Sequence, residues 1–390
     1  MSRFPLRKIW SFFFLIAFCE HSPAQTKTPP STEIQKHLAE AASALRANQS
    51  SDAEAAYLAI LKIDPSNLDA RVNLGIVAMV EQHWAKAAHS FRKALKVQPS
   101  LWNAQALLGL CELHLEHVQE ATQLMSHALP HLKDSKLRIE SGLPFVDILH
   151  QKGELEKAAS ILAEMQELDP TNADILYATY RINSDLAMKA VNSLALAAPD
   201  SAQLHRALAE HAVNQGRIEN AISEYRKALE INPNSPALHF EYGQALIEDS
   251  RLEASQSLAE KEFETALAQN PADARPECEL GKIAMRRSDS KAAADHYERA
   301  ARVNPDLACA RVGLSTLLME AGKITEALEY LEVAARTAPL DPEVCHRLAV
   351  TYRALGRTED ADREMAKFKE LQEVKDQLEK AFLETGTEKQ

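Results

Sequence analysis

The sequence predicts an all-α fold, a solenoid of about ten stacked helix-turn-helix units with a capping helix at the C-terminus. The first observation is a spacing of 34 residues between prolines, each of which follows a short run of apolar and polar residues. The second is composition: 46% of the residues are hydrophobic, only 6% are aromatic and 11 are glycine, which is typical of alanine- and leucine-rich helices. A period of this length indicates one supersecondary unit that stacks on its neighbours. The prolines are Pro65 and Pro99, Pro199 and Pro233, and Pro271, Pro305 and Pro339.

Small residues recur at fixed places within this period. Ten residues after several of the prolines stands a glycine, which we expect to let a second helix approach the first closely. A separate set of glycines falls between the two helices of a unit, where a left-handed turn costs glycine least. Alanines stand 22 residues after most of the prolines, on the second helix. The residues are Gly75, Gly109, Gly243 and Gly281; Gly153, Gly216, Gly322 and Gly356; and Ala87, Ala121, Ala221, Ala293, Ala327 and Ala361.

These positions make the chain resemble the tetratricopeptide repeat (TPR) family. The segments Asn73-Leu74-Gly75, Ala221 to Pro233 and Gly322 to Ala327 match the family pattern closely. The resemblance implies a right-handed superhelical solenoid whose first helices line a concave surface that binds proteins or peptides.

Three units depart from the pattern. Unit 102–135 has Pro130 inside its second helix, unit 236–273 carries four extra residues around Arg251 to Ala254, and unit 173–201 is five residues short and has no turn glycine. We therefore expect an irregular short repeat over 171–201 between two TPR blocks, 34–170 and 202–375. The units are 34–67, 68–101, 102–135, 136–172, 173–201, 202–235, 236–273, 274–307, 308–341 and 342–375.

The C-terminal stretch continues the helical pattern. Apolar residues at intervals of three or four predict a helix that covers the end of the stack, and 376–390 is its end and a tail. A dimerisation helix is the alternative. The apolar residues are Phe368, Leu371, Val374, Leu378 and Phe382.

The N-terminus predicts export. Basic residues precede an apolar run from Ile9 to Cys19, and small residues follow it, so residues 1–24 are expected to be a signal peptide cut between Ala24 and Gln25. The run is too short to span a bilayer, and no integral membrane span is expected in the mature chain. An uncleaved anchor and lipidation at Cys19 remain alternatives. Residues 25–33 are expected to be disordered, and the mature protein to be periplasmic or secreted.

The charge excludes one class of partner. The chain carries −12, and removal of residues 1–24, which hold three bases and one acid, brings it to about −14. Strong acidity argues against binding nucleic acid, because that binding depends on neutralising phosphates. Solubility explains the acidity, and a partner with a basic segment is the sharper alternative.

No residue pattern predicts a metal, a cofactor or catalysis. His114, His117, His127 and His131 lie too far apart along a helix hairpin to converge on one ion. Motifs for nucleophilic, phosphate-binding, metalloprotease and dinucleotide chemistry are missing from the sequence. The repeats fill the chain, so we expect a protein that is not an enzyme.

Four cysteines remain after residue 24: Cys111, Cys278, Cys309 and Cys345. Each lies in the first helix of a different unit, so we expect four free thiols that pack as small hydrophobic groups. A bridge from Cys309 to Cys278 or to Cys345 is the alternative.

The candidate binding residues are those expected to face the concave surface. In the first block they form an apolar strip, and in the second a mixed, polar ladder. We expect the apolar strip to be exposed and to bind an amphipathic helix or an extended segment. The alternative is that tight winding or the segment before Ile34 covers it. The strip is Val72, Ile76, Met79, Ala106, Leu110 and Leu113; the ladder is Arg206, Glu210, Phe240, Gln244, Lys282 and His346.

The sequence thus predicts a non-enzymatic scaffold that binds a protein or peptide with a basic or an apolar amphipathic segment. Two alternatives stay open. One is a structural subunit of an envelope export or assembly complex. The other is a noncatalytic accessory subunit of an enzyme complex, such as one for glycan processing or cytochrome maturation.

Overall fold

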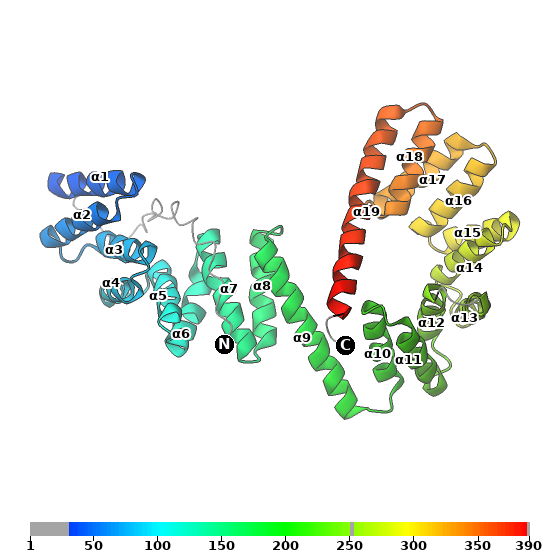
Figure 1. Cartoon of the computed structure of the whole chain (residues 1–390), viewed down its shortest axis with the longest axis horizontal. Coiled ribbons are helices and arrows are strands. Elements are labelled where there is room, and N and C mark those ends of the chain that lie inside the picture. The colour runs from blue at the N-terminus through cyan, green and yellow to red at the C-terminus, as the bar shows by residue number, and fades with distance from the viewer. Residues whose placement is uncertain (1–30, 250–252, 388–390) are drawn as a thin grey trace. The chain divides into compact units, whose positions relative to one another are not determined.

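The computed structural model describes residues 31–249 and 253–387 (Figure 1). The expected signal peptide, the cleavage site between Ala24 and Gln25, and residues 25–30 lie outside the described residues. The described part holds nineteen α-helices, one short 3₁₀-helix and no strand. The predicted all-α class is therefore confirmed.

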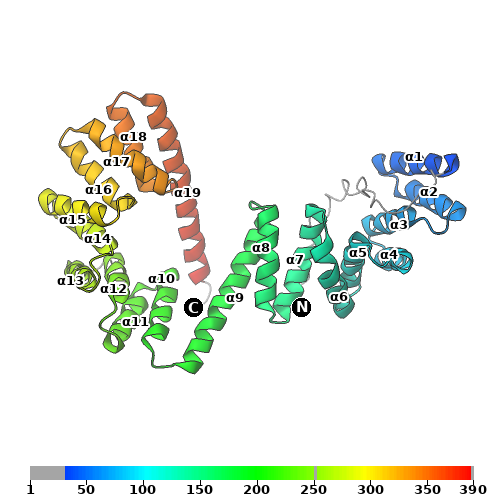
Figure 2. The same ribbon diagram turned by 180° about the vertical axis from the view of Figure 1, so that it is seen from behind.

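The chain divides into two compact units, which we call unit 1 and unit 2 (Figures 1 and 2). Unit 1 ends at Lys189 and unit 2 begins at Ala190, within the segment 171–201 where the sequence predicted an interruption. In both units consecutive helices pack as antiparallel hairpins. The helices that begin in unit 1 are α1 (Thr32–Arg46), α2 (Ser50–Ile63), α3 (Leu68–Val80), α4 (Trp84–Val97), α5 (Trp102–His114), α6 (Val118–Ala128), η2 (Leu129–His131), α7 (Ser135–Gln151), α8 (Leu155–Leu168) and α9 (Ala173–Ala197).

Unit 2 contains five hairpins after α9. Each first helix contacts its own second helix, and each second helix contacts the first helix of the next hairpin. The helices are α10 (Ala202–Asn214), α11 (Ile218–Ile231), α12 (Pro236–Glu248), α13 (Glu253–Gln269), α14 (Arg275–Arg286), α15 (Ser290–Val303), α16 (Ala308–Glu320), α17 (Ile324–Thr337), α18 (Pro342–Ala354) and α19 (Thr358–Thr387).

The short repeat differs from its prediction. The expected hairpin over 173–201 is one continuous helix, α9, of 25 residues. The five missing residues and the missing glycine are those that would form a turn, so the i to i−4 hydrogen bonds continue without a break. Helix α9 buries Ile175, Ala178 and Ile182 in its first half.

Turn residues close the hairpins as the sequence predicts. Gly153 and Gly216 have φ values of 73° and 68°, in the left-handed region that favours glycine. In hairpins without a glycine, Asn48 and Ser288 take the same conformation, with φ values of 58° and 61°. The turn therefore keeps its geometry when the residue changes.

The helical glycines allow close packing, as predicted. A Cβ atom built on Gly243 would lie 2.6 Å from Cε1 of Phe263 on the facing helix. Gly281 and Gly313 lie on either side of the Tyr297 ring, where a Cβ would come within 2.6 and 2.4 Å of ring carbons. These glycines seat an aromatic residue of the second helix against the first helices of two successive hairpins.

At both ends of the described chain, the helix boundaries differ from those expected. The last residues of the expected disordered lead-in are ordered, because the Ser31 hydroxyl accepts a hydrogen bond from the Ile34 amide and caps α1. At the other end, α19 is both the second helix of the last hairpin and the C-terminal extension. Val374 and Leu378 on this extension are 51% and 53% exposed.

Candidate protein-binding surface

The apolar strip of unit 1 is not an exposed surface. Val72, Ile76, Met79, Ala106 and Leu110 are buried, and Leu113 packs against the same core cluster. Ile76 is only 7% exposed and Leu110 only 9%. The expectation that this strip lies open was wrong, because its side chains belong to the hydrophobic core that continues from α3 to the first half of α9.

The ladder of unit 2 contains both buried and accessible residues. Phe240 is buried, whereas Arg206, Lys282 and His346 are partly exposed and Glu210 and Gln244 are exposed. They stand on the first helices α10, α12, α14 and α18. This ladder therefore offers polar groups to solvent above an apolar base.

Arg206 connects the first two rungs of the ladder. Its Nε atom donates to Oε1 of Glu210 at 3.0 Å on the same helix and to Oε2 of Glu241 at 2.9 Å on α12. A second guanidinium nitrogen donates to the other Glu241 oxygen. Sequence reasoning missed Glu241, although its place beside Phe240, one hairpin after Arg206, is a signal that could have found it.

Tyr225, which lies on α11, has a raised pKa. Burial raises the pKa of Tyr225, and the negative charges of Glu241, Glu210 and Glu248 raise it further, while Arg206 acts in the opposite direction. Burial also raises the pKa of Glu241, against the hydrogen bonds and positive charge of Arg206. Desolvation is the largest cause of both shifts.

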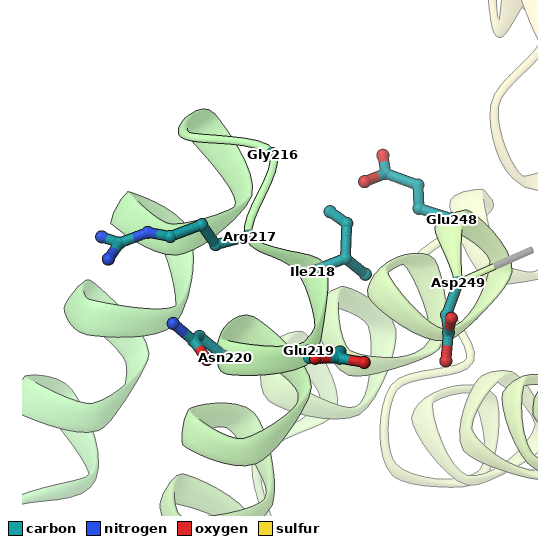
Figure 3. A pocket seen from close by; sticks show the side chains of 7 residues that line it. All are labelled: Gly216, Arg217, Ile218, Glu219, Asn220, Glu248 and Asp249. Atoms are coloured by element: carbon teal, nitrogen blue, oxygen red, sulfur yellow. The ribbon is translucent and has the colours of Figure 1, made fainter. Parts of the chain in front are cut away.

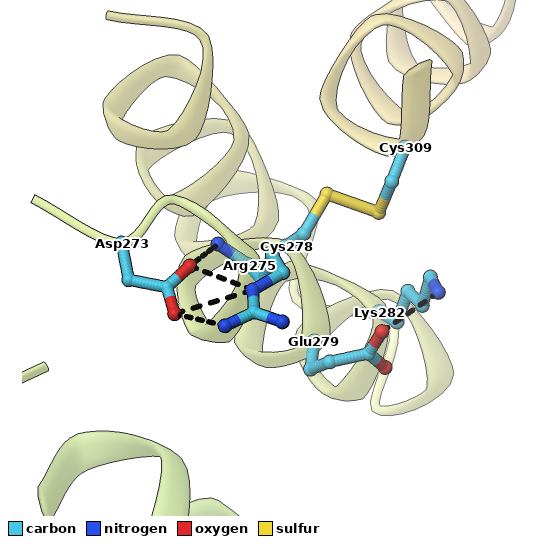
Figure 4. The surroundings of a disulfide bond; sticks show 6 residues. All are labelled: Asp273, Arg275, Cys278, Glu279, Lys282 and Cys309. Atoms are coloured by element: carbon cyan, nitrogen blue, oxygen red, sulfur yellow. Dashed lines mark hydrogen bonds and ion pairs between the residues drawn. A yellow bond between two sulfur atoms is a disulfide. The ribbon is translucent and has the colours of Figure 1, made fainter. Parts of the chain in front are cut away.

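Further along the ladder, charges are paired locally. Arg275 places its guanidinium carbon 4.6 Å from the centre of the Phe240 ring and binds the carboxylate of Asp273 (Figure 4). Lys282 donates to Glu279 at 3.0 Å, one turn apart on α14. Phe240 is buried because it belongs to the core cluster of unit 2, where its ring centre lies 5.8 Å from that of Phe263.

At the end of unit 2 the ladder meets α19. The ring of His346 lies 5.0 Å from that of Phe368, at an angle of 50°. His346 thus contacts the helix that closes the last hairpin and keeps part of its surface accessible.

A disulfide joins Cys278 on α14 to Cys309 on α16 (Figure 4). The prediction of four free thiols was therefore wrong, whereas Cys111 and Cys345 are free and buried. The Cα atoms of the bonded cysteines are 6.2 Å apart. The usual spacing of helix axes argues against such a bridge, but residues on facing sides of adjacent first helices come closer than their axes.

An acidic hollow of about 420 Å³ lies at the turn between α10 and α11. Glu219, Glu248 and Asp249 contribute carboxylates to it, and the Glu248 side chain extends toward the turn at Gly216 (Figure 3). Arg217 lines the hollow but directs its guanidinium group away from Glu248.

Unit 1 contains a buried charge that the sequence analysis did not single out. Glu112 is fully buried, and its Oε2 lies 2.7 Å from Nδ1 of His117. Nη2 of Arg92 lies 2.7 Å from the other oxygen, an ion-pair contact without hydrogen-bond geometry, and 3.2 Å from Glu120. Glu112, His117 and Glu120 lie close enough to share a metal ion, and Arg92 forms ion pairs with both of the carboxylates. The positions that correspond to Glu112 in three hairpins of unit 2 hold Ala212, Leu246 and Ala284. A charged residue at a position that is otherwise apolar was the signal that could have identified Glu112.

No helix in the described ranges has the length and apolar character required to cross a membrane. This finding concerns residues 31–249 and 253–387 alone.

Comparison with known proteins identifies the repeats. Models described as tetratricopeptide repeat match residues 38–82, 73–132, 278–342 and 318–367, and one described as TPR repeat matches 213–249. No curated protein matches the chain. These matches cover more than half of the sequence and fall in both units.

Several solved structures resemble parts of the chain. The MamA protein is 19% identical and matches 46% of this chain and 96% of its own, with a TM-score of 0.35. YrrB, described as a TPR protein with an unusual peptide-binding site, is 21% identical over 47% of this chain and 92% of its own, with a TM-score of 0.34. PilF of Pseudomonas aeruginosa is 19% identical over 60% of this chain and 90% of its own, with a TM-score of 0.39.

Three findings indicate the same repeat: the matches to the repeat models, the stacked helix hairpins, and the glycines that hold an aromatic ring against successive first helices. On these grounds the chain belongs to the tetratricopeptide repeat family.

Proposed function

We propose that this protein is an exported, non-enzymatic scaffold that binds a protein or peptide segment along the first helices of unit 2. TPR units are in general protein-interaction modules, and protein or peptide partners follow from this fold. The observation that carries the proposal is the ladder of unit 2. Glu210 and Gln244 are exposed there, whereas Tyr225 and Phe240 belong to the core cluster of the same unit.

This surface is suited to a segment and not to a small substrate. Helices α10 and α12 are fixed to one another by Arg206 and to their second helices by buried aromatic rings. A rigid base of this kind lets exposed polar groups bind a partner with little loss of conformational entropy. The perturbed pKa values at Tyr225 and Glu241 follow from burial and neighbouring charges, so they require no catalytic role.

A steric block tests the proposed surface. Gln244→Trp places a large ring at an exposed position of α12, on the proposed surface. Arg226→Trp places the same ring at an exposed position of α11 and serves as the matched control. We expect tagged wild type and Arg226→Trp to retain the same partner from the native envelope, and Gln244→Trp to lose it at an unchanged melting temperature. Equal retention by all three proteins would place binding elsewhere.

Export is the second part of the proposal. The Cys278–Cys309 bond supports it, since stable disulfides are typical of oxidising compartments. The basic flank and the short apolar run before Ala24 support it independently. Intact-mass analysis of protein isolated from the envelope or the medium should give a chain that begins at Gln25. A chain that begins at Met1 and is confined to the cytoplasm would contradict it.

A further inference from the structure

Helix α9 packs onto the preceding hairpin as a first helix does. Its buried residues Ile175, Ala178 and Ile182 share one core cluster with Leu162 and Met165 of α8. Both views show α9 beside α8 (Figures 1 and 2). The chain then continues as one helix where the second helix of this hairpin would begin, so the repeat does not cover the other side of α9.

That other side of α9 is exposed and apolar. Leu176 is 42% exposed, and Tyr177 and Tyr180 are each 65% exposed. Leu176 and Tyr180 are four residues apart, so they lie one turn apart on the same side of the helix. We call these three residues the exposed face of α9. Exposed apolar side chains that lie next to one another are typical of interaction sites.

The repeat register shows what this face contacts in other hairpins. Tyr180 stands ten residues after Pro170, and the corresponding residue of the other first helices is small and buried. A Cβ atom on Gly75 would lie 2.7 Å from the Phe91 ring on its own second helix, α4. Tyr180 therefore points to where a second helix packs. The small residues at this position are Gly75, Gly109, Ala209, Gly243, Gly281, Ser315 and Ala349.

Leu176 stands at a second position that contacts the second helix. It follows Pro170 by six residues, as His205 follows Pro199. Nδ1 of His205 lies 2.6 Å from Oε2 of Glu224 on α11, the second helix of its hairpin. Leu176 and Tyr180 thus both stand on the side of a first helix that a second helix normally covers.

The exposed face of α9 is also uncharged. Beyond the first turn of α9, each charged residue up to position 189 pairs with a residue of α7 or α8. The pairs are Arg181 with Asp147, Asp185 with His150, and Lys189 with Glu156. Asn183 and Ser184 are exposed and neutral. Charge complementarity therefore favours an occupant whose contact face is uncharged.

We propose that the exposed face of α9 binds an amphipathic helix of a partner protein, in the place of a second helix. In the other hairpins the first helix carries the small residue, and the second helix of the Gly75 and Gly281 hairpins carries the ring. On α9 the ring belongs to Tyr180, so the occupant presents a small residue such as alanine there. Because this surface belongs to unit 1, the inference goes beyond the proposed function.

The test uses the purified full chain and two labelled helical peptides that differ at one residue. Both have an apolar face of leucine and alanine and a polar face of lysine and glutamate pairs. The centre of the apolar face holds alanine in one peptide and phenylalanine in the other. A peptide of the same composition in scrambled order is the negative probe. Binding is measured by fluorescence anisotropy.

The variants change the exposed face of α9 or a matched site. Tyr180→Ala restores the small residue of the other hairpins, and Tyr180→Phe keeps the ring. Leu176→Ser is matched by Leu58→Ser, since Leu58 on α2 is also 42% exposed. Circular dichroism establishes that each variant is folded.

We expect the wild type to bind the alanine peptide about three- to tenfold more tightly than the phenylalanine peptide, because two rings overfill one contact. Tyr180→Ala should reverse this preference, and Tyr180→Phe should keep it. Leu176→Ser should weaken binding about two- to fivefold through lost apolar contact, whereas Leu58→Ser should bind as the wild type does.

Several results would overturn the inference. They are an unchanged preference in Tyr180→Ala, equal binding of the scrambled peptide, and failure of both helical peptides to bind. A wild-type dimer that Tyr180→Ala converts to a monomer in sedimentation would show that a second copy of the chain covers this face instead. Gln244→Trp should retain peptide binding, and its loss would place the peptide on the ladder of unit 2.

Discussion

Units 1 and 2 contain the same repeat, yet residues at one corresponding position are buried in unit 1 and exposed in unit 2. Eleven residues after the closing proline, unit 1 has Ile76 and Leu110, which are buried in its core. At the corresponding place unit 2 has Glu210 and Gln244, which are exposed. The repeat fixes the helix and the face on which a residue stands. The chemistry of that residue then decides whether the face joins the core or remains available to a partner.

This contrast changes where a binding surface is expected. An apolar strip on a repeat protein looks like a docking site when only the sequence is known. Its burial in unit 1 shows that hydrophobic side chains there stabilise the stack. The polar ladder of unit 2 includes exposed Glu210 and Gln244 beside Phe240, which is part of the core, so it combines exposed polar groups with a packed base.

The largest effect should come from placing charges in the unit 1 strip. The double variant Ile76→Asp with Leu110→Asp buries two unpaired carboxylates, and we expect it to lose about 5 kcal/mol of stability or to unfold unit 1. Tryptophan fluorescence reports on this unit, because Trp84 and Trp102 belong to it and residues 190–390 contain no tryptophan.

Gln244→Asp is the matched control, since it adds a carboxylate at the exposed corresponding position of unit 2. It should change stability by no more than about 0.5 kcal/mol. An unchanged unfolding curve for the double variant would show that the strip is accessible after all.

The sequence could predict the architecture because each signature residue has a local role. Gly243 is required by the Phe263 ring, and Gly216 by a turn with positive φ. Such roles recur at a fixed period and can be read without knowing the packing. The continuous helix α9 was harder to predict. A repeat that lacks its turn residues is shorter, but its length alone does not determine whether the chain bends or continues as one helix.

The interactions between hairpins could not be predicted in the same way. The Arg206–Glu241 pair and the Cys278–Cys309 bond depend on how closely adjacent first helices approach, to within a few ångströms. Exposure of the unit 1 strip depended on the same packing. Periodicity places a residue on a face, but the distance between faces is set by all the side chains that lie between them.

The second-largest effect on stability should come from removing the disulfide. This bond joins two hairpins of unit 2 and has no counterpart among the described residues of unit 1. It closes a loop with a sequence separation of 31 residues. Chain entropy then predicts that Cys278→Ser with Cys309→Ser lowers stability by about 3 to 4 kcal/mol. Far-UV circular dichroism should show that unit 2 of the double variant unfolds at a lower denaturant concentration than in the wild type. The unfolding midpoint of unit 1, followed by tryptophan fluorescence, should not change.

Two controls sharpen this experiment. A reductant should reproduce the loss in the wild type and have no further effect on unit 2 in the double variant. Thiol titration of the denatured, unreduced chain from Gln25 onward should detect only Cys111 and Cys345. Detection of four thiols would mean that the bond does not form.

The smallest effect compares one carboxyl group from each unit across pH. Burial raises the pKa of Glu140 on α7 in unit 1, against the charge of Lys136, and burial raises the pKa of Glu241 in unit 2. A pKa that is higher in the folded state than in the unfolded state means that folding favours the protonated form. The resulting stability is present below the ordinary value of 4.5 and is lost as pH rises through the folded pKa.

Glutamine stays neutral throughout this range, so Glu140→Gln and Glu241→Gln should each remove that loss. We therefore expect each variant to gain stability relative to the wild type as pH rises above about 4.5, in its own unit only. Glu277→Gln should show the opposite sign: burial acts to raise the pKa of Glu277, but hydrogen bonds from His296 and Arg299 outweigh it and leave the pKa lowered. Denaturant unfolding at a series of pH values, followed by tryptophan fluorescence for unit 1 and circular dichroism for unit 2, measures these differences. If Glu241→Gln and Glu277→Gln change the pH dependence of stability in the same direction, burial and pairing are not balanced at the two carboxyl groups in the way described.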